Sequence, residues 1–172
     1  MDQRKFEDEV AAGAKHPPAR VIEDLVSFRL QMMVLIGERS ARQWMEQMFG
    51  LSLNEWRMLA LVQSRAPCRA GEISDLLHMD KSQTSRVIKA LESRGLMGNQ
   101  PDPEDGRAVS LHLTEDGAMM LSKMFEEILR SNERILAPLD AEEAQAFHAT
   151  LGKLINHSQD LLEARLGRPV TR

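Results

Sequence analysis

Hydrophobic residues recur every three to four positions along most of the chain, which is the spacing of one face of an α-helix. The first such pattern runs from Val21 to about Phe49, and its middle, "LQMMVLIG", is apolar nearly all round. A helix of that kind is buried on more than one side, commonly against another subunit. Capping boxes, in which a short polar residue precedes Glu or Gln by three positions, predict further helices after Ser52, Asp80 and Asp140.

Two short helices are predicted next to each other in the middle of the chain. "AGEISDLLHM" gives a helix with Ile73, Leu76 and Leu77 facing inward, and Asp80 then opens a second helix that Gly95 ends. A turn of about four residues separates them, which is the spacing of a helix-turn-helix.

The hydrophobic period then changes from 3.6 to 2. "LMGNQ" and "AVSLHLT" flank "PDPEDGR", and Val109, Leu111 and Leu113 alternate with more polar neighbours. Pro, Asp and Gly in the connector favour a turn, so a β-hairpin with a long tip is predicted. Helices from Thr114 to about Ala137 and from Asp140 to Gly167 complete the chain. The predicted fold class is mainly α with a small β-hairpin wing: a winged helix-turn-helix beside a helical region.

The second short helix has two distinct faces when it is wound at about 100° per residue. Its apolar side consists of Thr84, Val87, Ile88 and Leu91, whereas the opposite side carries short polar and cationic residues: Lys81, Ser82, Gln83, Ser85, Arg86 and Lys89. From position 81 to 94 the four cations and one acid give a local charge of +3, within a chain of net charge −4. This polar face therefore predicts a local anionic partner rather than indiscriminate nucleic-acid binding.

In a winged helix the second helix enters the major groove of DNA and the hairpin tip follows the backbone or the minor groove. Short Ser82 and Ser85 allow close approach, Gln83 suits an adenine edge, and Arg86 suits guanine or phosphate. Phosphate contacts are expected for Lys81 and Lys89. Arg107, at the predicted tip, is expected to reach the minor groove.

The amino-acid composition limits the class of protein further. The 172 residues are 42% hydrophobic but only 4% aromatic, with 11 Met and no Tyr, which suits a folded, helix-rich chain. There is no apolar run of about 18 residues and no signal-peptide core at the N-terminus, so a soluble cytoplasmic protein is expected. The single Cys68 excludes an internal disulfide.

These motifs resemble the MarR (multiple antibiotic resistance regulator) family of winged-helix transcription factors. The residues that carry the resemblance are "LSLNEWRMLALV", "EISDLLHMDKSQTSRVIKALESRGL" and "PDPEDGRAVSLHLTEDG". The resemblance implies a homodimer that binds a pseudo-palindromic operator, and repression that is relieved by a small anionic, often aromatic, ligand. By motif match, Ser82, Gln83, Ser85, Arg86 and Lys89 face DNA. Asp105 orients Arg107 in the wing.

The resemblance also suggests a division of the chain. Residues 1–20 form an N-terminal extension, 21–49 and 115–166 a helical dimerisation region, 50–114 the DNA-binding domain, and 167–172 a tail. Two departures concern the wing: "MGNQ" stands where relatives commonly carry cations, and Gly106 where they often have Arg. Fewer wing cations should weaken non-specific DNA affinity and its salt dependence.

An anionic effector needs a cation where water is scarce, together with an apolar wall. The candidates for this site are Arg29, Arg39, Arg42, Trp44, Trp56 and Arg57. The expected effector is an aromatic acid. The regulated genes are accordingly expected to serve the catabolism of aromatic compounds.

Two alternatives stay open. Cys68 beside Arg69 in a loop would have a lowered pKa and would make a redox-responsive regulator; alternatively, the winged helix is a protein-interaction module, which the negative net charge favours. An enzyme is not expected, because there is no phosphate-binding glycine loop and no convincing nucleophile–base pair. The five histidines are scattered, so neither a metal site nor a cofactor is expected.

Overall fold

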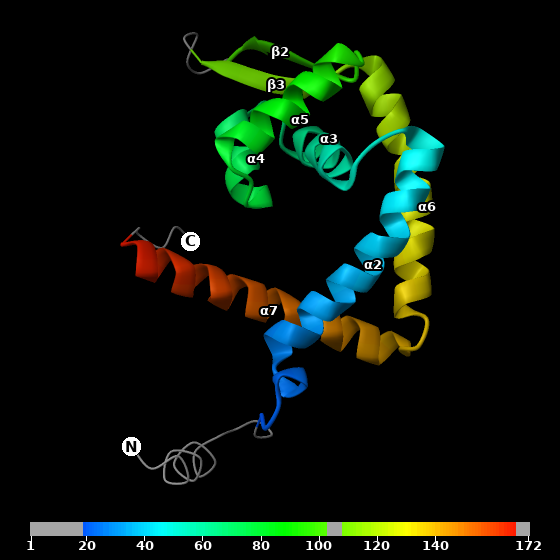
Figure 1. Cartoon of the computed structure of the whole chain (residues 1–172), viewed down its shortest axis with the longest axis vertical. Coiled ribbons are helices and arrows are strands. Elements are labelled where there is room, and N and C mark those ends of the chain that lie inside the picture. Colours follow the sequence, from blue (N-terminus) through cyan, green and yellow to red (C-terminus); the bar gives the residue numbers. More distant parts are fainter. Residues whose placement is uncertain (1–18, 103–107, 168–172) are drawn as a thin grey trace. The chain divides into compact units, whose positions relative to one another are not determined.

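The computed structural model describes residues 19–102 and 108–167. In chain order its elements are η1 (Ile22–Asp24), α2 (Val26–Phe49), α3 (Leu53–Arg65), β1 (Cys68–Arg69), α4 (Ala70–Leu77), α5 (Lys81–Ser93), β2 (Met97–Pro101), β3 (Val109–Leu113), α6 (Glu115–Leu136) and α7 (Ala141–Leu166) (Figure 1). The fold class predicted from the sequence is confirmed: the chain is mainly helical, with a small antiparallel sheet.

The three predicted capping boxes are present. Ser52, Asp80 and Asp140 each accept a hydrogen bond from the backbone N–H three residues later, and the Glu or Gln at that position accepts one in return. Each box satisfies two N–H groups that a helix start leaves without an intrahelical partner. The helix starts of α3, α5 and α7 are therefore fixed by local sequence.

The first helix begins later than predicted, at Val26 rather than Val21. The carboxylate of Asp24 accepts hydrogen bonds from the backbone N–H groups of Arg20 and Val21, at 2.8 and 3.2 Å, and these bonds lower the pKa of Asp24. Such local bonds compete with a continuous helix. They hold a separate 3₁₀ turn, and Leu25 is extended between that turn and α2.

The hairpin is confirmed, but the sheet contains one strand more than predicted. Its order is β1-β3-β2, with Met97 opposite Leu113 and Pro101 opposite Val109. The predicted alternation of burial along β3 is wrong, because Ser110 is fully buried whereas Val109 is 54% exposed. Ser110 lies between residues of both neighbouring strands, and Val109 lies toward the wing tip.

The start of α6 is held against the end of the preceding hairpin. Thr114 Oγ1 donates to the carbonyl oxygen of Gly95 at 2.6 Å, and the backbone N–H of Gly117 donates to Thr114 Oγ1 at 3.0 Å. A Cβ atom on Gly117 would lie 1.9 Å from the carbonyl oxygen of Leu96. Only glycine permits this approach of helix and backbone.

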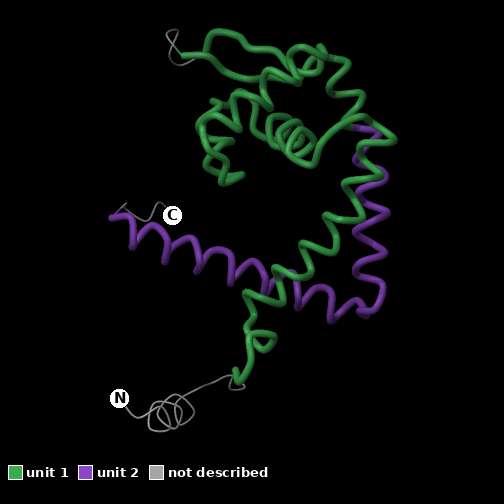
Figure 2. The backbone as a smooth tube through the Cα atoms, in the orientation of Figure 1, with its two compact units in different colours: residues 1–121 green, residues 122–172 purple. Residues whose placement is uncertain are grey.

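By contacts the chain forms two compact units, residues 1–121 and 122–172 (Figure 2). The core of the first unit draws side chains from α2 through β3: Met45, Leu51, Met58, Leu59, Val62, Ile73, Leu91, Leu96, Met97 and Leu111. Leu76, predicted to face inward, is 44% exposed because it lies near the end of α4, beside the turn. The functional division into reader and dimerisation regions remains a prediction.

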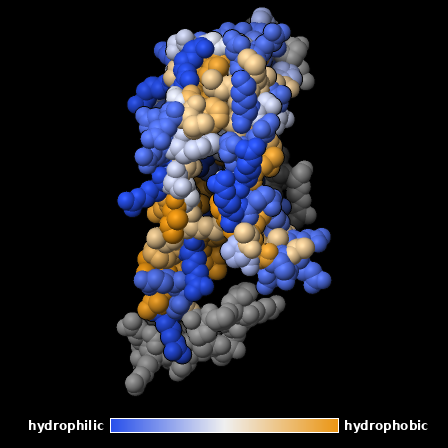
Figure 3. Space-filling model, turned by 90° about the vertical axis from the view of Figure 1, so that its right-hand side faces the viewer, coloured by the Kyte–Doolittle hydropathy of each residue, from blue (hydrophilic) through white to orange (hydrophobic). Residues whose placement is uncertain are grey.

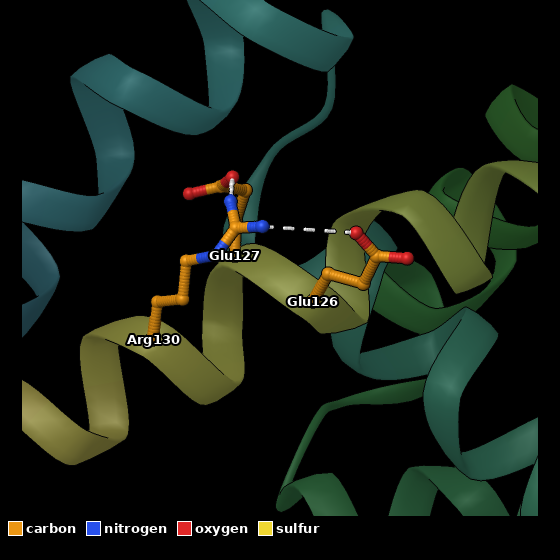
Figure 4. A network of polar contacts seen from close by, with 3 residues as sticks. All are labelled: Glu126, Glu127 and Arg130. Atoms are coloured by element: carbon orange, nitrogen blue, oxygen red, sulfur yellow. Dashed lines mark hydrogen bonds and ion pairs between the residues drawn. The ribbon is translucent and has the colours of Figure 1, made fainter.

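The second unit comprises the rest of α6 and α7. On α6, Arg130 forms ion pairs with Glu126 and Glu127, which lie one turn before it (Figure 4). On α7, large apolar side chains are exposed: Leu154, Ile155, Leu161, Leu162 and Leu166. The face drawn in Figure 3 shows hydrophobic side chains at the surface among charged ones. Among the described residues no helix is long and apolar enough to cross a membrane.

Candidate DNA interface

A hydrogen-bond network joins α4 to α5 and fixes the turn between them. Ser74 Oγ donates to the carbonyl oxygen of Met79 at 2.7 Å, and Thr84 Oγ1 lies 3.0 Å from Ser74 Oγ and 2.9 Å from the carbonyl oxygen of Asp80. His78 closes α4 with a left-handed backbone, φ 50°. The buried Thr84 hydroxyl is thus satisfied, and the network sets the direction in which α5 leaves the turn.

The polar face of α5 is exposed along its whole length. Thr84 and Leu91 are buried against the core, as predicted, and Val87 and Ile88 are half-buried. All six side chains expected to face DNA are solvent-exposed: Lys81, Ser82, Gln83, Ser85, Arg86 and Lys89. The structure therefore brings these residues together on one accessible helix face.

Gln83 has a structural role that the sequence pattern only partly revealed. Its Oε1 accepts a hydrogen bond from the backbone N–H of Asp80 at 3.1 Å, while its own N–H donates to Asp80 Oδ1 at 2.7 Å. Pairing with an adenine edge uses both the amide oxygen and the amide nitrogen. Gln83 must therefore exchange or share its capping bond in order to read a base.

Arg86 is held along the helix. Its Nε donates to the carbonyl oxygen of Ser82 at 3.4 Å, which draws the guanidinium toward the N-terminus of α5. Within the described part of the chain, no acceptor is hydrogen-bonded to its terminal amino groups. Those groups are available for the two parallel hydrogen bonds by which arginine binds guanine or phosphate.

The wing is braced on both sides below its tip. The backbone N–H of Asp102 donates to the carbonyl oxygen of Ala108 at 3.0 Å. The Asp102 carboxylate also pairs with Arg69 Nε at 2.9 Å, and this ion pair connects β1 to the end of β2. On the other side, Asn99 Nδ2 donates to Glu92 Oε1 at 2.7 Å, which ties β2 to α5. Asp105 and Arg107, the predicted wing residues, lie outside the described residues.

The candidate effector residues differ in exposure and in the partners that they contact. Arg57 Nη2 forms a half-buried ion pair with Glu38 at 2.7 Å, and Arg29 Nε donates to the carbonyl oxygen of Glu23 at 2.8 Å. The other two cations, Arg39 and Arg42, are exposed on α2.

Both tryptophans are half-buried. The ring of Trp44 meets that of Phe49 edge to face, with centroids 5.5 Å apart. Of the four candidate cations, Arg57 is paired with a residue of α2 and Arg29 with a residue of η1, the turn before α2.

Cys68 does not lie in a loop, and the expectation that its pKa is lowered is wrong. It is 2% exposed in β1, opposite Leu111 of β3. Burial of the thiol, followed by the charge of Glu72, raises the pKa of Cys68. Arg65 acts in the opposite direction, with a smaller effect. A buried thiol of raised pKa is a poor nucleophile at neutral pH.

Within residues 19–102 and 108–167, no three His, Cys, Asp or Glu side chains are grouped so that they would hold a metal ion.

A helix-turn-helix followed by a braced hairpin defines a winged-helix protein. The family model "MarR family" matches residues 51–109, which cover α3 through the start of β3. The HTH-type transcriptional regulator YkoM of Bacillus subtilis (strain 168), itself uncharacterized, is 30% identical over 127 residues, 74% of this chain and 81% of YkoM. The chain belongs to the MarR family of transcriptional regulators.

Two further comparisons agree with this membership. The HTH-type transcriptional repressor NicR of Pseudomonas putida is 28% identical over 102 residues, 59% of this chain and 65% of NicR. The crystal structure of a MarR/EmrR family transcriptional regulator from Acinetobacter sp. ADP1 is 25% identical, with a TM-score of 0.71, and covers 78% of this chain and 94% of that one.

Proposed function

We propose that this regulator is a homodimeric repressor that binds a pseudo-palindromic operator through α5 and releases it when a small anionic, aromatic acid binds. The observation that carries the proposal is the face of α5 described above. Six polar or cationic side chains are exposed on one helix, whose opposite face is buried and whose start is fixed by the Ser74–Thr84 network.

The proposed roles follow from the chemistry of each side chain. Lys81 and Lys89 neutralise phosphates, and Ser82 and Ser85 permit the helix to approach the groove closely. Gln83 reads an adenine, and Arg86 reads guanine or holds a phosphate. In the wing, Asp105 orients Arg107 toward the minor groove.

Exposed apolar side chains on α2 support a dimer. Met32, Met33, Val34, Leu35 and Ile36 are consecutive, and each is 40–67% exposed. A helix turns by about 100° per residue, so this run is apolar on every side and cannot be covered by one neighbour within a monomer. We assign a second copy of the chain as its partner, through residues 21–49 and 115–166.

The effector site is proposed near the C-terminal half of α2. Arg39 and Arg42 are the cations that remain exposed there, with Trp44 and Trp56 as apolar surfaces, whereas Arg29 and Arg57 serve as supports. The name of NicR as a repressor supports the negative sign of control.

The test of DNA binding starts from a pool of randomised duplexes, from which the full-length protein selects its own site. We expect one palindromic sequence to be enriched, and the affinity for it to fall steeply with salt. Benzoate and its hydroxylated derivatives are then titrated into the complex, and one of them is expected to release the DNA. Failure to enrich any sequence contradicts the proposed function, and failure of all the acids contradicts only the effector class.

A further inference from the structure

Arg94 lies at the C-terminal end of α5 and is one of the four cations in the basic segment from position 81 to 94. Its guanidinium instead donates two hydrogen bonds to the backbone at the end of α2: Nη1 to the carbonyl oxygen of Gly50 at 2.6 Å and Nη2 to that of Phe49 at 3.0 Å. These partners are 44 and 45 residues away in sequence. The cation that ends α5 is therefore committed to another helix.

The carbonyl groups that Arg94 contacts are ones that attract a cation. The last four carbonyl groups of a helix have no intrahelical partner, and the helix dipole makes that end negative. Gly50 ends α2 in a left-handed conformation, φ 62°. A planar guanidinium suits two neighbouring oxygens, whereas the ammonium group of lysine is a single point of charge.

Buried leucines lie close in sequence to both partners of this contact. Leu51 and Leu53, one and three residues after Gly50, are buried. Leu91 and Leu96, three residues before Arg94 and two after it, are buried as well. The end of α2 and the end of α5 are thus both anchored in one core, and Arg94 connects them at its surface. α2 belongs to the proposed dimerisation region and α5 to the proposed reader.

We propose that Arg94 is a positioning residue that fixes the direction of α5 relative to α2 and thereby sets the half-site spacing that the dimer accepts. This proposal rests on the proposed function. In a dimer of winged helices the half-sites lie about one duplex turn apart, so the angle between reader and dimerisation helix decides whether both readers fit. Arg94 acts through α5 and makes no contact with DNA.

The experiment uses the duplex that the wild-type protein selects, together with two derivatives in which one base pair is inserted or removed between the half-sites. Affinities of the wild type, Arg94→Ala and Arg94→Lys are measured for all three duplexes over a salt series. Arg65→Ala is the matched control, since it removes an exposed cation from the end of α3. Circular dichroism is used to check that each variant is folded.

For Arg94→Ala we expect the affinity for the selected duplex to fall about tenfold, while the penalty for altered spacing shrinks. The salt slope should stay that of the wild type, because no phosphate contact is lost. The affinity and the spacing penalty of Arg94→Lys should lie between those of the wild type and of Arg94→Ala. If Arg94→Ala does not fold, Arg94→Lys serves as the test variant. The control should bind all three duplexes as the wild type does.

Two results overturn the proposal. An unchanged spacing penalty in both variants shows that Arg94 does not position α5, and a salt slope reduced by about one per subunit shows that it contacts phosphate. If the wild type selects no duplex, the proposed function itself fails, and this role fails with it. A selected duplex combined with an unchanged spacing penalty removes only the role of Arg94.

Discussion

The side chain of Gln83 is hydrogen-bonded to the backbone N–H of Asp80, the residue that caps the same helix. One side chain therefore stabilises the start of α5 and stands at the position expected to read a base. Removing it affects both tasks, so a simple truncation would not separate them. A substitution that keeps the capping hydrogen bond but changes the group that faces the DNA groove would separate the two tasks.

Gln83→Glu is that substitution. A carboxylate at this position accepts the same bond from Asp80 and lies favourably at the positive end of the helix, so the free energy of unfolding should change by less than about 0.5 kcal/mol. DNA affinity should fall about tenfold or more, because the amide donor is lost and a negative charge faces phosphates. Thermal unfolding and duplex binding measure the two effects. Retention of wild-type affinity by this variant would remove Gln83 from the interface.

Gly117→Ala should destabilise the protein by about 1–3 kcal/mol. The added Cβ would lie 1.9 Å from the carbonyl oxygen of Leu96, so the start of α6 or the hairpin end has to shift. The matched control is Gly71→Ala in α4, where a Cβ meets nothing within 4 Å; it should be neutral or stabilise by up to about 1 kcal/mol. Equal unfolding midpoints in denaturant for both variants would contradict the close approach.

Cys68 should react slowly with thiol reagents in the folded protein. Because burial raises its pKa, the folded state holds the thiol proton more tightly than the unfolded state does. The stabilisation linked to this thiol is therefore present below the unfolded pKa and is lost as pH rises through the folded one. We expect alkylation at about pH 8 to be much slower in native than in denatured protein, and peroxide to leave DNA binding unchanged. Rapid native alkylation would restore the redox alternative.

Ile36→Glu should weaken the dimer. Ile36 is the most exposed of the apolar residues 32–36 on α2, and in the proposed interface its replacement buries an unpaired charge. Sedimentation should show monomers at concentrations where the wild type is dimeric, with operator affinity lost in parallel. Gln63→Glu introduces the same charge at an exposed polar position of α3, outside residues 21–49 and 115–166, and serves as the control. A monomeric wild type would contradict the proposed assembly directly.

Much of the fold could be predicted because its signals are local. Capping boxes at Ser52, Asp80 and Asp140 give three helix starts, and the change of hydrophobic period gives the hairpin. The strand β1 could not be predicted, since two residues carry no period. The burial of Ser110 follows from its place between β1 and β2, which depends on pairing with distant residues.

The candidate site could likewise be predicted from the sequence only where its signals are local. The exposed face of α5 follows from helical spacing, so all six residues could be selected from the sequence. Arg94 has the same charge and lies on the same helix segment, but its partners are backbone carbonyl groups that any sequence would supply. The placement of Cys68 failed for a related reason: its burial depends on a strand partner, Leu111, far along the chain.

The most direct test of the central claim, that α5 reads DNA, is the affinity of Arg86→Ala for the selected duplex and for a scrambled one over a salt series. We predict a loss of about 1–3 kcal/mol on the selected duplex, roughly fivefold to 150-fold in affinity, and a relaxed preference at one position of each half-site. Arg65→Ala, which removes a cation elsewhere, should bind both duplexes as the wild type does. Full wild-type affinity and preference in Arg86→Ala would contradict the assignment of α5 as the reading helix.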